Sequence, residues 1–158
     1  MGDQFHNSRN KMLALAAQVA SQYGHARIEP EHMLFALLSQ KPGGGYNYVD
    51  VVTALKDKYI QSSFMIKRLD DFLSSPSNGI AKGSRVTSYY PTQAAERMLA
   101  EAAEISMQLE KTENFTGLHM IYAMTKSQGP VASSILGEQH INQKLMKEIL
   151  RINNRPPE

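Results

Sequence analysis

The 158-residue chain contains no cysteine. It therefore has no disulfide, no thiolate metal site and no thiol nucleophile, which fits a reducing compartment. No apolar run approaches the roughly 20 residues that a membrane-spanning helix needs. The stretch from Met1 to Asn10 is polar and lacks the apolar core of a signal peptide. We therefore expect a cytoplasmic protein that makes no contact with a membrane.

The chain also lacks a strong charge of either sign. It has 17 basic and 15 acidic residues, a formal net charge of +2. The basic residues are spread out, and their nearest approach to a cluster is Lys56, Lys58, Lys67 and Arg68. A nucleic-acid binder needs a basic patch or stripe, so we expect no nucleic-acid partner. The hydrophobic content of 42% is that of a folded globular protein, and the length fits one compact domain.

Recognised catalytic and nucleotide-binding motifs are missing too. The glycines from Gly43 to Gly45 are not followed by the Lys-Ser/Thr pair that reaches phosphate and magnesium in a Walker loop. No Gly-x-Ser-x-Gly turn is present. Asp70 and Asp71 are adjacent on a predicted helix and point to different faces. We expect a non-enzymatic chain with no catalytic residues and no cofactor.

A metal site is equally poorly supported. His25, Glu29 and His32 are one candidate set, but Pro30 and a predicted helix start separate His25 from the other two. Zinc requires a convergent tetrahedral set of ligands. We expect no metal.

What the chain does contain is an internal repeat. The segment from Met12 to Val19 aligns with Met98 to Ile105 at an offset of 86, with five of eight residues identical. Ile28 to Ala36 then aligns with Phe115 to Ala123 at an offset of 87. After the glycine-rich stretch of the first copy the offset drops to 81, where Ile60 matches Ile141. The gaps fall in predicted turns, as expected for a duplication.

Each copy predicts four helices. In the first copy, apolar residues recur at three- and four-residue steps from Met12 to Tyr23, and Gly24 is a plausible stop. A second helix begins with Pro30 at its first position. A third spans roughly 49–58 and a fourth roughly 63–73, and their counterparts open at Pro130 and after the N-cap Asn142. No alternating β pattern competes, so the predicted fold is all-α: two tandem four-helix repeats with pseudo-twofold symmetry in one compact domain.

The predicted boundaries follow from composition. We assign 1–75 to the first repeat, 76–91 to a linker, 92–152 to the second repeat and 153–158 to a tail or the start of a tether. The stretch from Ser74 to Ser88 is rich in serine, glycine and proline, which is typical of a linker.

The segment from Ile28 to Leu38 reads IEPEHMLFALL and follows an alanine-rich helix. This pattern resembles the Clp N-terminal repeat, which occurs in two tandem copies, as here. The resemblance covers nearly the whole chain. It implies a helical domain mounted ahead of the AAA+ ATPase rings of a Clp-type unfoldase, which receives adaptor proteins or substrates.

The resemblance also suggests partner-binding residues. Some relatives hold adaptors or charged degradation marks through the glutamate of the motif and the starts of the first helices, which match Glu31, His6 and Thr92 here. Leu118 stands where the second copy of many members keeps glutamate, and this departure indicates a divergent member. Our hypothesis is that a groove between the repeats, or the helix starts near His6 and Thr92, captures a partner, with Glu31 as a polar anchor.

Other residues invite structural interpretations. His32 and His119 occupy equivalent positions beside apolar faces, and we expect each imidazole to be hydrogen-bonded within the fold. Most methionines fit the core, whereas Met107 and Met124 replace Ser or Leu in the other copy and are candidates for exposure. Tyr46 and Tyr48, beside the glycines, are further candidates for partner contact.

The sequence thus predicts a protein-docking module that binds an adaptor or substrate polypeptide and belongs with C-terminal AAA+ modules. We expect the isolated domain to be a monomer. The alternative is a free-standing Clp-repeat regulator of a Clp ATPase or protease ring. A small-molecule enzyme is a distant third possibility.

Overall fold

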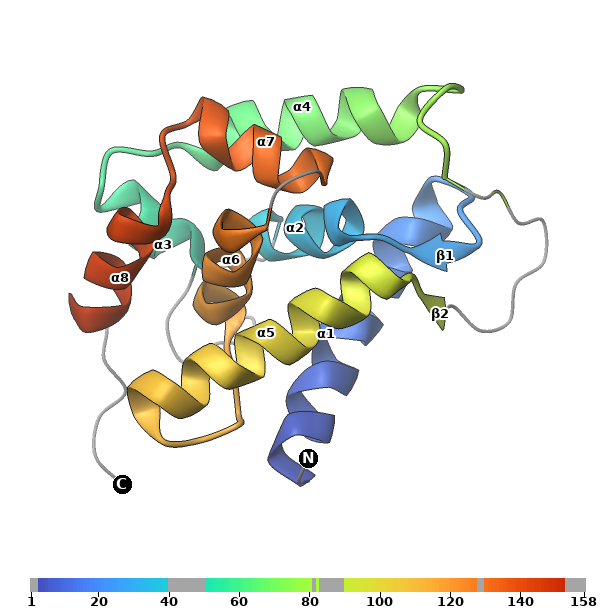
Figure 1. Cartoon of the computed structure of the whole chain (residues 1–158). Coiled ribbons are helices and arrows are strands. Elements are labelled where there is room, and N and C mark those ends of the chain that lie inside the picture. The colour runs from blue at the N-terminus through green and yellow to red at the C-terminus, as the bar shows by residue number, and fades with distance from the viewer. Residues whose placement is uncertain (1–2, 40–50, 81, 83–89, 128–129, 153–158) are drawn as a thin grey trace.

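A computed structural model describes residues 3–39, 51–80, 82, 90–127 and 130–152. Within these ranges the chain is mostly helical, with very little sheet (Figure 1). The elements in chain order are α1 (Asp3–Gln22), β1 (Arg27–Ile28), α2 (Pro30–Leu38), α3 (Val51–Lys56), α4 (Ser62–Ser74), β2 (Tyr90–Pro91), α5 (Gln93–Glu110), α6 (Gly117–Lys126), α7 (Val131–Glu138) and α8 (Gln143–Ile152). Helices α1 to α4 form the first repeat and α5 to α8 the second, which confirms the predicted fold class.

The helix ends are equivalent in the two repeats. Gly24 follows α1 with a φ of 70°, and Lys111 follows α5 with a φ of 62°. Tyr59 after α3 and His140 after α7 have φ values of 62° and 59°. Each of these last two turns is closed by the next residue, whose N–H donates to a carbonyl five residues back. Such left-handed caps satisfy carbonyls at helix ends, and their recurrence supports the duplication inferred from the sequence.

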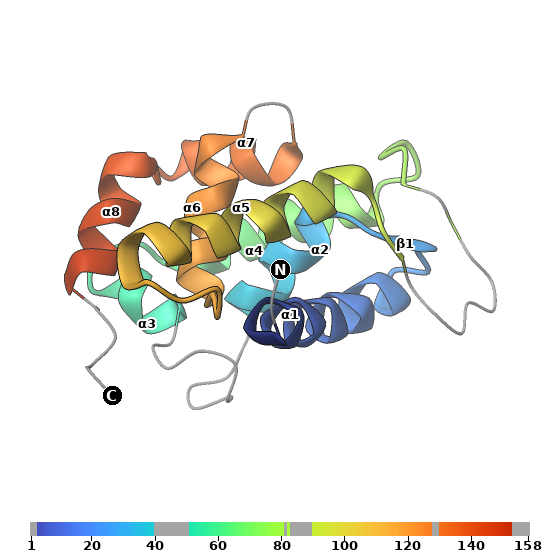
Figure 2. The same ribbon diagram turned by 60° about the horizontal axis from the view of Figure 1, so that its bottom comes forward.

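The helices pack in three layers with α2 and α6 in the middle (Figures 1 and 2). Helices α1 and α5 cover one side of this central pair, and α4 and α7 cover the other. The central helices are almost wholly buried. Aligned positions of the outer helices also point inward, since Met12 and Met98 are 0% and 2% exposed. Burying a side chain of this size contributes about 1.5–3 kcal/mol, so the repeated apolar positions hold both halves on one core.

The repeats are joined by a small element that the sequence did not predict. Strands β1 and β2 pair in parallel, with Arg27 opposite Tyr90 and Ile28 opposite Pro91. Both residues of β2 lie within the linker that composition predicts at 76–91. The N–H of the next residue, Thr92, donates to the carbonyl of Ile28 over 2.9 Å, which extends the pairing to the start of α5.

Ion pairs also cross between the repeats. The Arg9 guanidinium on α1 contacts the Glu96 carboxylate on α5. Arg68 on α4 binds Glu138 at the end of α7 through two hydrogen bonds of 3.0 and 2.9 Å. These contacts lie in both outer layers, so the two repeats are joined on both sides of the central helices.

The predicted caps of α8 and α7 had different outcomes. The side-chain carbonyl of Asn142 accepts a hydrogen bond of 2.9 Å from the Leu145 N–H, as predicted for an N-cap. Pro130, expected at the first position of its helix, is instead the N-cap residue of α7 with an extended ψ of 144°. None of the helices in the described ranges is long and apolar enough to cross a membrane.

Candidate protein-docking surface

Two buried histidines close the starts of the central helices. The Glu29 N–H donates to Nδ1 of His32 over 2.8 Å, and the Thr116 N–H donates to Nδ1 of His119 over 2.9 Å. Each histidine is the third residue of its helix and supplies the capping-box acceptor that is usually Glu or Gln. Both imidazoles are buried. The fold itself therefore gives a physical reason for histidine at this position in both repeats.

The other ring nitrogen has a different partner in each repeat. Because Nδ1 of His32 accepts, its Nε2 carries the proton and donates to Nδ1 of His25, 2.8 Å away. The pKa of His32 is lowered to about 3, mainly by burial and to a smaller extent by the neighbouring His25. Burial is also the main cause that lowers the pKa of His25. In the second repeat, Nε2 of His119 instead contacts the Glu110 carboxylate.

Both nitrogens of His32 are thus engaged by protein groups, which leaves no lone pair for a metal ion. Across the ranges that the structure describes, no three His, Asp or Glu side chains come together in a way that could hold one.

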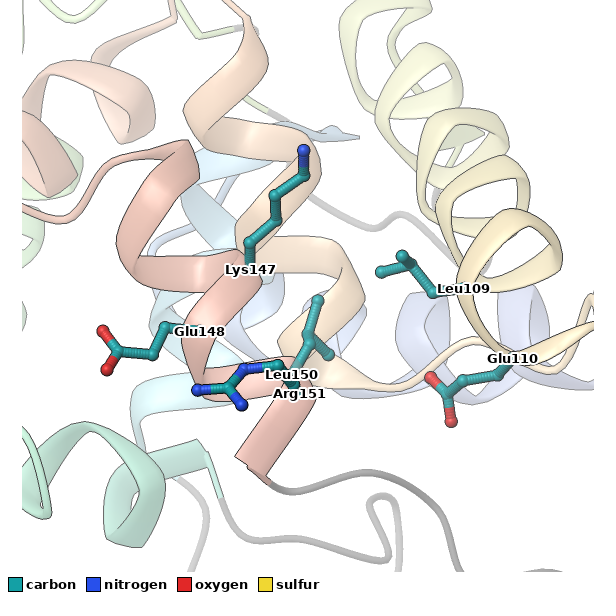
Figure 3. A pocket seen from close by; sticks show the side chains of 6 residues that line it. All are labelled: Leu109, Glu110, Lys147, Glu148, Leu150 and Arg151. Carbon is teal, nitrogen blue, oxygen red and sulfur yellow. The ribbon is translucent and has the colours of Figure 1, made fainter.

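The surface has a groove between the last turn of α5 and α8 (Figure 3). Its volume is about 380 Å³. Leu109 reaches across from α5 and is 47% exposed, whereas Leu150 on α8 is only 7% exposed and forms part of the floor. The full lining consists of Leu109, Glu110, Lys147, Glu148, Leu150 and Arg151. An apolar floor with charged groups along its edges suits a segment of another protein better than a polar small molecule.

The acidic and basic side chains of this groove differ in whether they have an ionic partner within the described residues. The Glu110 carboxylate contacts His119, and Glu148 forms an ion pair of 3.2 Å with Lys58 at the end of α3. Lys147 and Arg151 are exposed, and neither forms an ion pair with a described carboxylate. The groove therefore presents two cations whose counterions have to come from outside the described part of the molecule.

The equivalent place in the first repeat is bridged by a hydrogen bond. Tyr23 aligns with Leu109, and Asp70 aligns with Arg151. The Tyr23 hydroxyl donates to the Asp70 carboxylate, and its ring packs edge-on against Phe35 with centroids 5.9 Å apart. Burial and the bond to Asp70 raise the pKa of Tyr23 above its ordinary value. Leucine and arginine at the equivalent positions of the second repeat cannot make this bond.

Comparison with protein families decides the identity of the fold. The family model for the Clp repeat (R) N-terminal domain matches residues 4–139. The chain belongs to this family. The expected resemblance is therefore confirmed, and the described helices are the tandem Clp repeats. A comparison with curated protein sequences gave no match.

Solved structures have the same fold at low sequence identity. A chain of a malarial protein secretion system is 18% identical with a TM-score of 0.70, over 96% of this chain and 92% of that one. The Hsp104 N-terminal domain from Candida albicans is 17% identical with a TM-score of 0.66, over 92% and 89%. The N-terminal domain of the ClpV1 ATPase from the E. coli EAEC Sci1 T6SS is 20% identical with a TM-score of 0.63, over 92% and 83%.

Two of the predicted partner-binding residues of this Clp domain lie inside it. Glu31 is 5% exposed, and its carboxylate accepts a hydrogen bond of 2.8 Å from the Ala132 N–H in the first turn of α7. Burial raises the pKa of the Glu31 carboxyl, and the hydrogen bond from Ala132 opposes that effect. Leu118, its counterpart, is 2% exposed in the core. The structure therefore corrects the expected placement: neither side chain has surface with which to anchor a partner directly.

The other two predicted residues keep some exposure but lie in different settings. Thr92 is half-buried as the N-cap of α5, where its hydroxyl donates to Glu29 over 2.6 Å and accepts from the Ala95 N–H over 3.3 Å. His6 is exposed in α1, and its ring meets that of Phe5 edge-on. The four predicted residues do not form one surface.

Sequence reasoning missed the groove residues. Leu109 fits the apolar pattern of α5 and reads as core. The available signal was the change from Tyr23 and Asp70 to Leu109 and Arg151 between the copies. Of the two methionines marked for exposure, Met107 is 41% exposed and Met124 is buried. Tyr46 and Tyr48 lie outside the described residues.

Proposed function

We propose that this domain docks an adaptor or substrate protein for a Clp-type AAA+ unfoldase, whose ATPase modules do the mechanical work. Membership of the Clp repeat N-terminal domain family, matched over residues 4–139, is the observation that carries the proposal. The proposed role is binding alone: the domain brings a protein to the ATPase and catalyses no reaction itself.

The described chemistry fits binding better than catalysis. The buried polar groups Glu31, His32 and His119 are engaged in hydrogen bonds or ion pairs within the fold. What remains accessible is a helical surface with an open groove beside Leu109. Moderate affinity would suffice, because several copies held on one ring raise the effective concentration of the docking site. His6 and Thr92 remain proposed contacts on the strength of the resemblance.

Capture of partners from a native lysate tests this function. The immobilised domain is incubated with lysate, the bound proteins are identified, and the dissociation constant of each purified partner is measured by calorimetry. We expect an adaptor or substrate that binds the domain directly and is degraded or unfolded only when the cognate ATPase and ATP are added.

The matched control is an unrelated helical domain of similar size and net charge on the same resin. If no protein is enriched over this control, or if the enriched proteins are subunits of a Clp ring that the free domain inhibits, docking of substrates is the wrong function. The second result would favour the free-standing regulator.

A further inference from the structure

We propose that the groove between α5 and α8 binds an acidic amphipathic segment of a partner protein, with an apolar side chain between Leu109 and Leu150 and carboxylates on Lys147 and Arg151. The inference rests on the proposed docking function and adds the place and the chemistry of the bound segment. It concerns the second repeat alone.

The apolar part of the groove selects the anchor. Leu109 leaves nearly half of its surface exposed beside the floor formed by Leu150. Water over these two side chains is displaced favourably only by another apolar group. The volume of about 380 Å³ is near the lower end of the range of about 300–1,000 Å³ seen for ligand pockets. It suits one or two side chains on a short segment.

The charged edge selects acidic flanks. Glu110 and Glu148 already interact with His119 and Lys58 inside the domain, so they add little attraction for a cation from outside. Lys147 and Arg151 both come from α8, four residues apart, and so lie on the same face of the helix. A partner with carboxylates on either side of its anchor would complement both cations, whereas a basic segment would be repelled.

Comparison with the first repeat supports a binding site in the second repeat alone. There Tyr23 and Asp70 (the closing pair) bond to each other across the equivalent place. The second repeat lacks this bond because leucine and arginine stand at the two aligned positions. Restoring the closing pair in the second repeat should remove the site without touching the central helices.

Peptide binding tests the proposal directly. The probe is a fluorescein-labelled synthetic helix that carries leucines one turn apart flanked by glutamates, and fluorescence anisotropy gives its dissociation constant. Two further peptides replace the glutamates by lysines or the leucines by serines. We expect the acidic leucine peptide to bind at least about tenfold more tightly than either, and more weakly as salt is raised.

Variants of the whole chain assign the site. Lys147→Glu/Arg151→Glu reverses the charged edge, and Leu109→Tyr/Arg151→Asp rebuilds the closing pair of the first repeat. Each should weaken binding of the acidic peptide about tenfold or more. The matched control is Lys11→Glu/Arg97→Glu, which reverses two exposed cations on other surfaces and should leave binding unchanged. Circular dichroism melting identifies any variant that fails to fold.

The outcomes separate the two proposals. The groove assignment is overturned if the acidic peptide binds the charge-reversed chain as tightly as the unmodified one, or if the lysine peptide binds equally well. If the groove variants still capture a purified lysate partner at unchanged affinity, the docking function stands and the groove is not its site. If no partner is captured and no peptide binds, both proposals are wrong.

Discussion

The carboxylate of Glu31 on α2 accepts a hydrogen bond of 2.8 Å from the backbone N–H of Ala132 in α7, and so connects residues 101 apart in the chain. The bond satisfies an N–H in the first helical turn of α7, which has no partner within its own helix. It also places a negative group at the positive end of that helix. A residue that the sequence motif suggests for partner contact thus joins the two repeats from inside.

Glu31→Ala should therefore destabilise the domain. It leaves the Ala132 N–H buried and unpaired, a loss of about 1–3 kcal/mol. Glu31→Gln keeps an acceptor oxygen and should lose less. Urea unfolding monitored by circular dichroism measures both, with Glu104→Ala on an exposed face of α5 as the control. If Glu31→Ala unfolds at the urea concentration of the unmodified domain, the bond does not hold the repeats together.

Thr92→Ala should destabilise the junction between the repeats. The threonine hydroxyl caps α5 and donates to Glu29, so its removal costs two hydrogen bonds. Loss of an N-cap alone costs about 0.5–2 kcal/mol, and Thr92→Ser keeps the hydroxyl as a matched control. In thermal melting, the melting temperature of the serine variant should lie close to that of the unmodified domain, and that of the alanine variant should be lower than both. Equal melting temperatures for the two variants would contradict a capping role.

The duplication made most of the fold predictable. Aligning Met12 with Met98 placed both long outer helices, and the Ile60 and Ile141 match placed the shorter helices with the correct change of offset. Such positions are predictable because apolar periodicity determines which face of a helix is buried. The same periodicity carries no information about which helix packs against that face.

The candidate site was predicted less well, because the sequence pattern does not show which helices pack against each other. Glu31 reads as a surface residue because it is charged, and only the position of α7 supplies the N–H that allows its burial. Leu109 reads as core because it is apolar, and only the lack of a neighbour over it leaves it exposed. The pairing of Ile28 with Pro91 lies at the end of an apparent linker and carries no strand pattern of its own.

Tyr59→Gly should stabilise the domain. Tyr59 has a φ of 62° and is 97% exposed, so the substitution removes backbone strain and almost no packing. The left-handed conformation costs about 1–2 kcal/mol for an L-residue, and glycine removes this cost. The greater freedom of glycine in the unfolded chain lowers the free energy of unfolding by roughly 0.5–1 kcal/mol and so offsets part of the gain. We expect a net increase of about 0.5–1 kcal/mol in the free energy of unfolding. Tyr59→Ala keeps the strain and should show no such increase; a matching gain in alanine would contradict the explanation.

The His25–His32 pair should make stability depend on pH. The pKa of His32 is lowered to about 3, and that of His25 is also lowered, so each histidine binds a proton less readily in the folded domain than in the unfolded chain. The unfolded state therefore takes up more protons than the folded state as the pH falls below the ordinary histidine value of about 6.5. The stabilisation is complete above that pH and is lost progressively on acidification towards about pH 3.

A variant isolates this contribution. His32→Gln keeps a side chain that can accept from the Glu29 N–H at the third helical position, but it removes the bond to His25 and one titrating group. Urea unfolding at a series of pH values between neutral and mildly acidic gives the slope of stability against pH for both chains. Each proton taken up only by the unfolded state contributes at most about 1.4 kcal/mol per pH unit. The stability of the unmodified domain should fall more steeply on acidification, because the glutamine of the variant does not titrate. Glu29 and Lys82, which influence the pKa of His25, are present in both chains. Equal slopes would mean that the buried pair is not the group that titrates on unfolding.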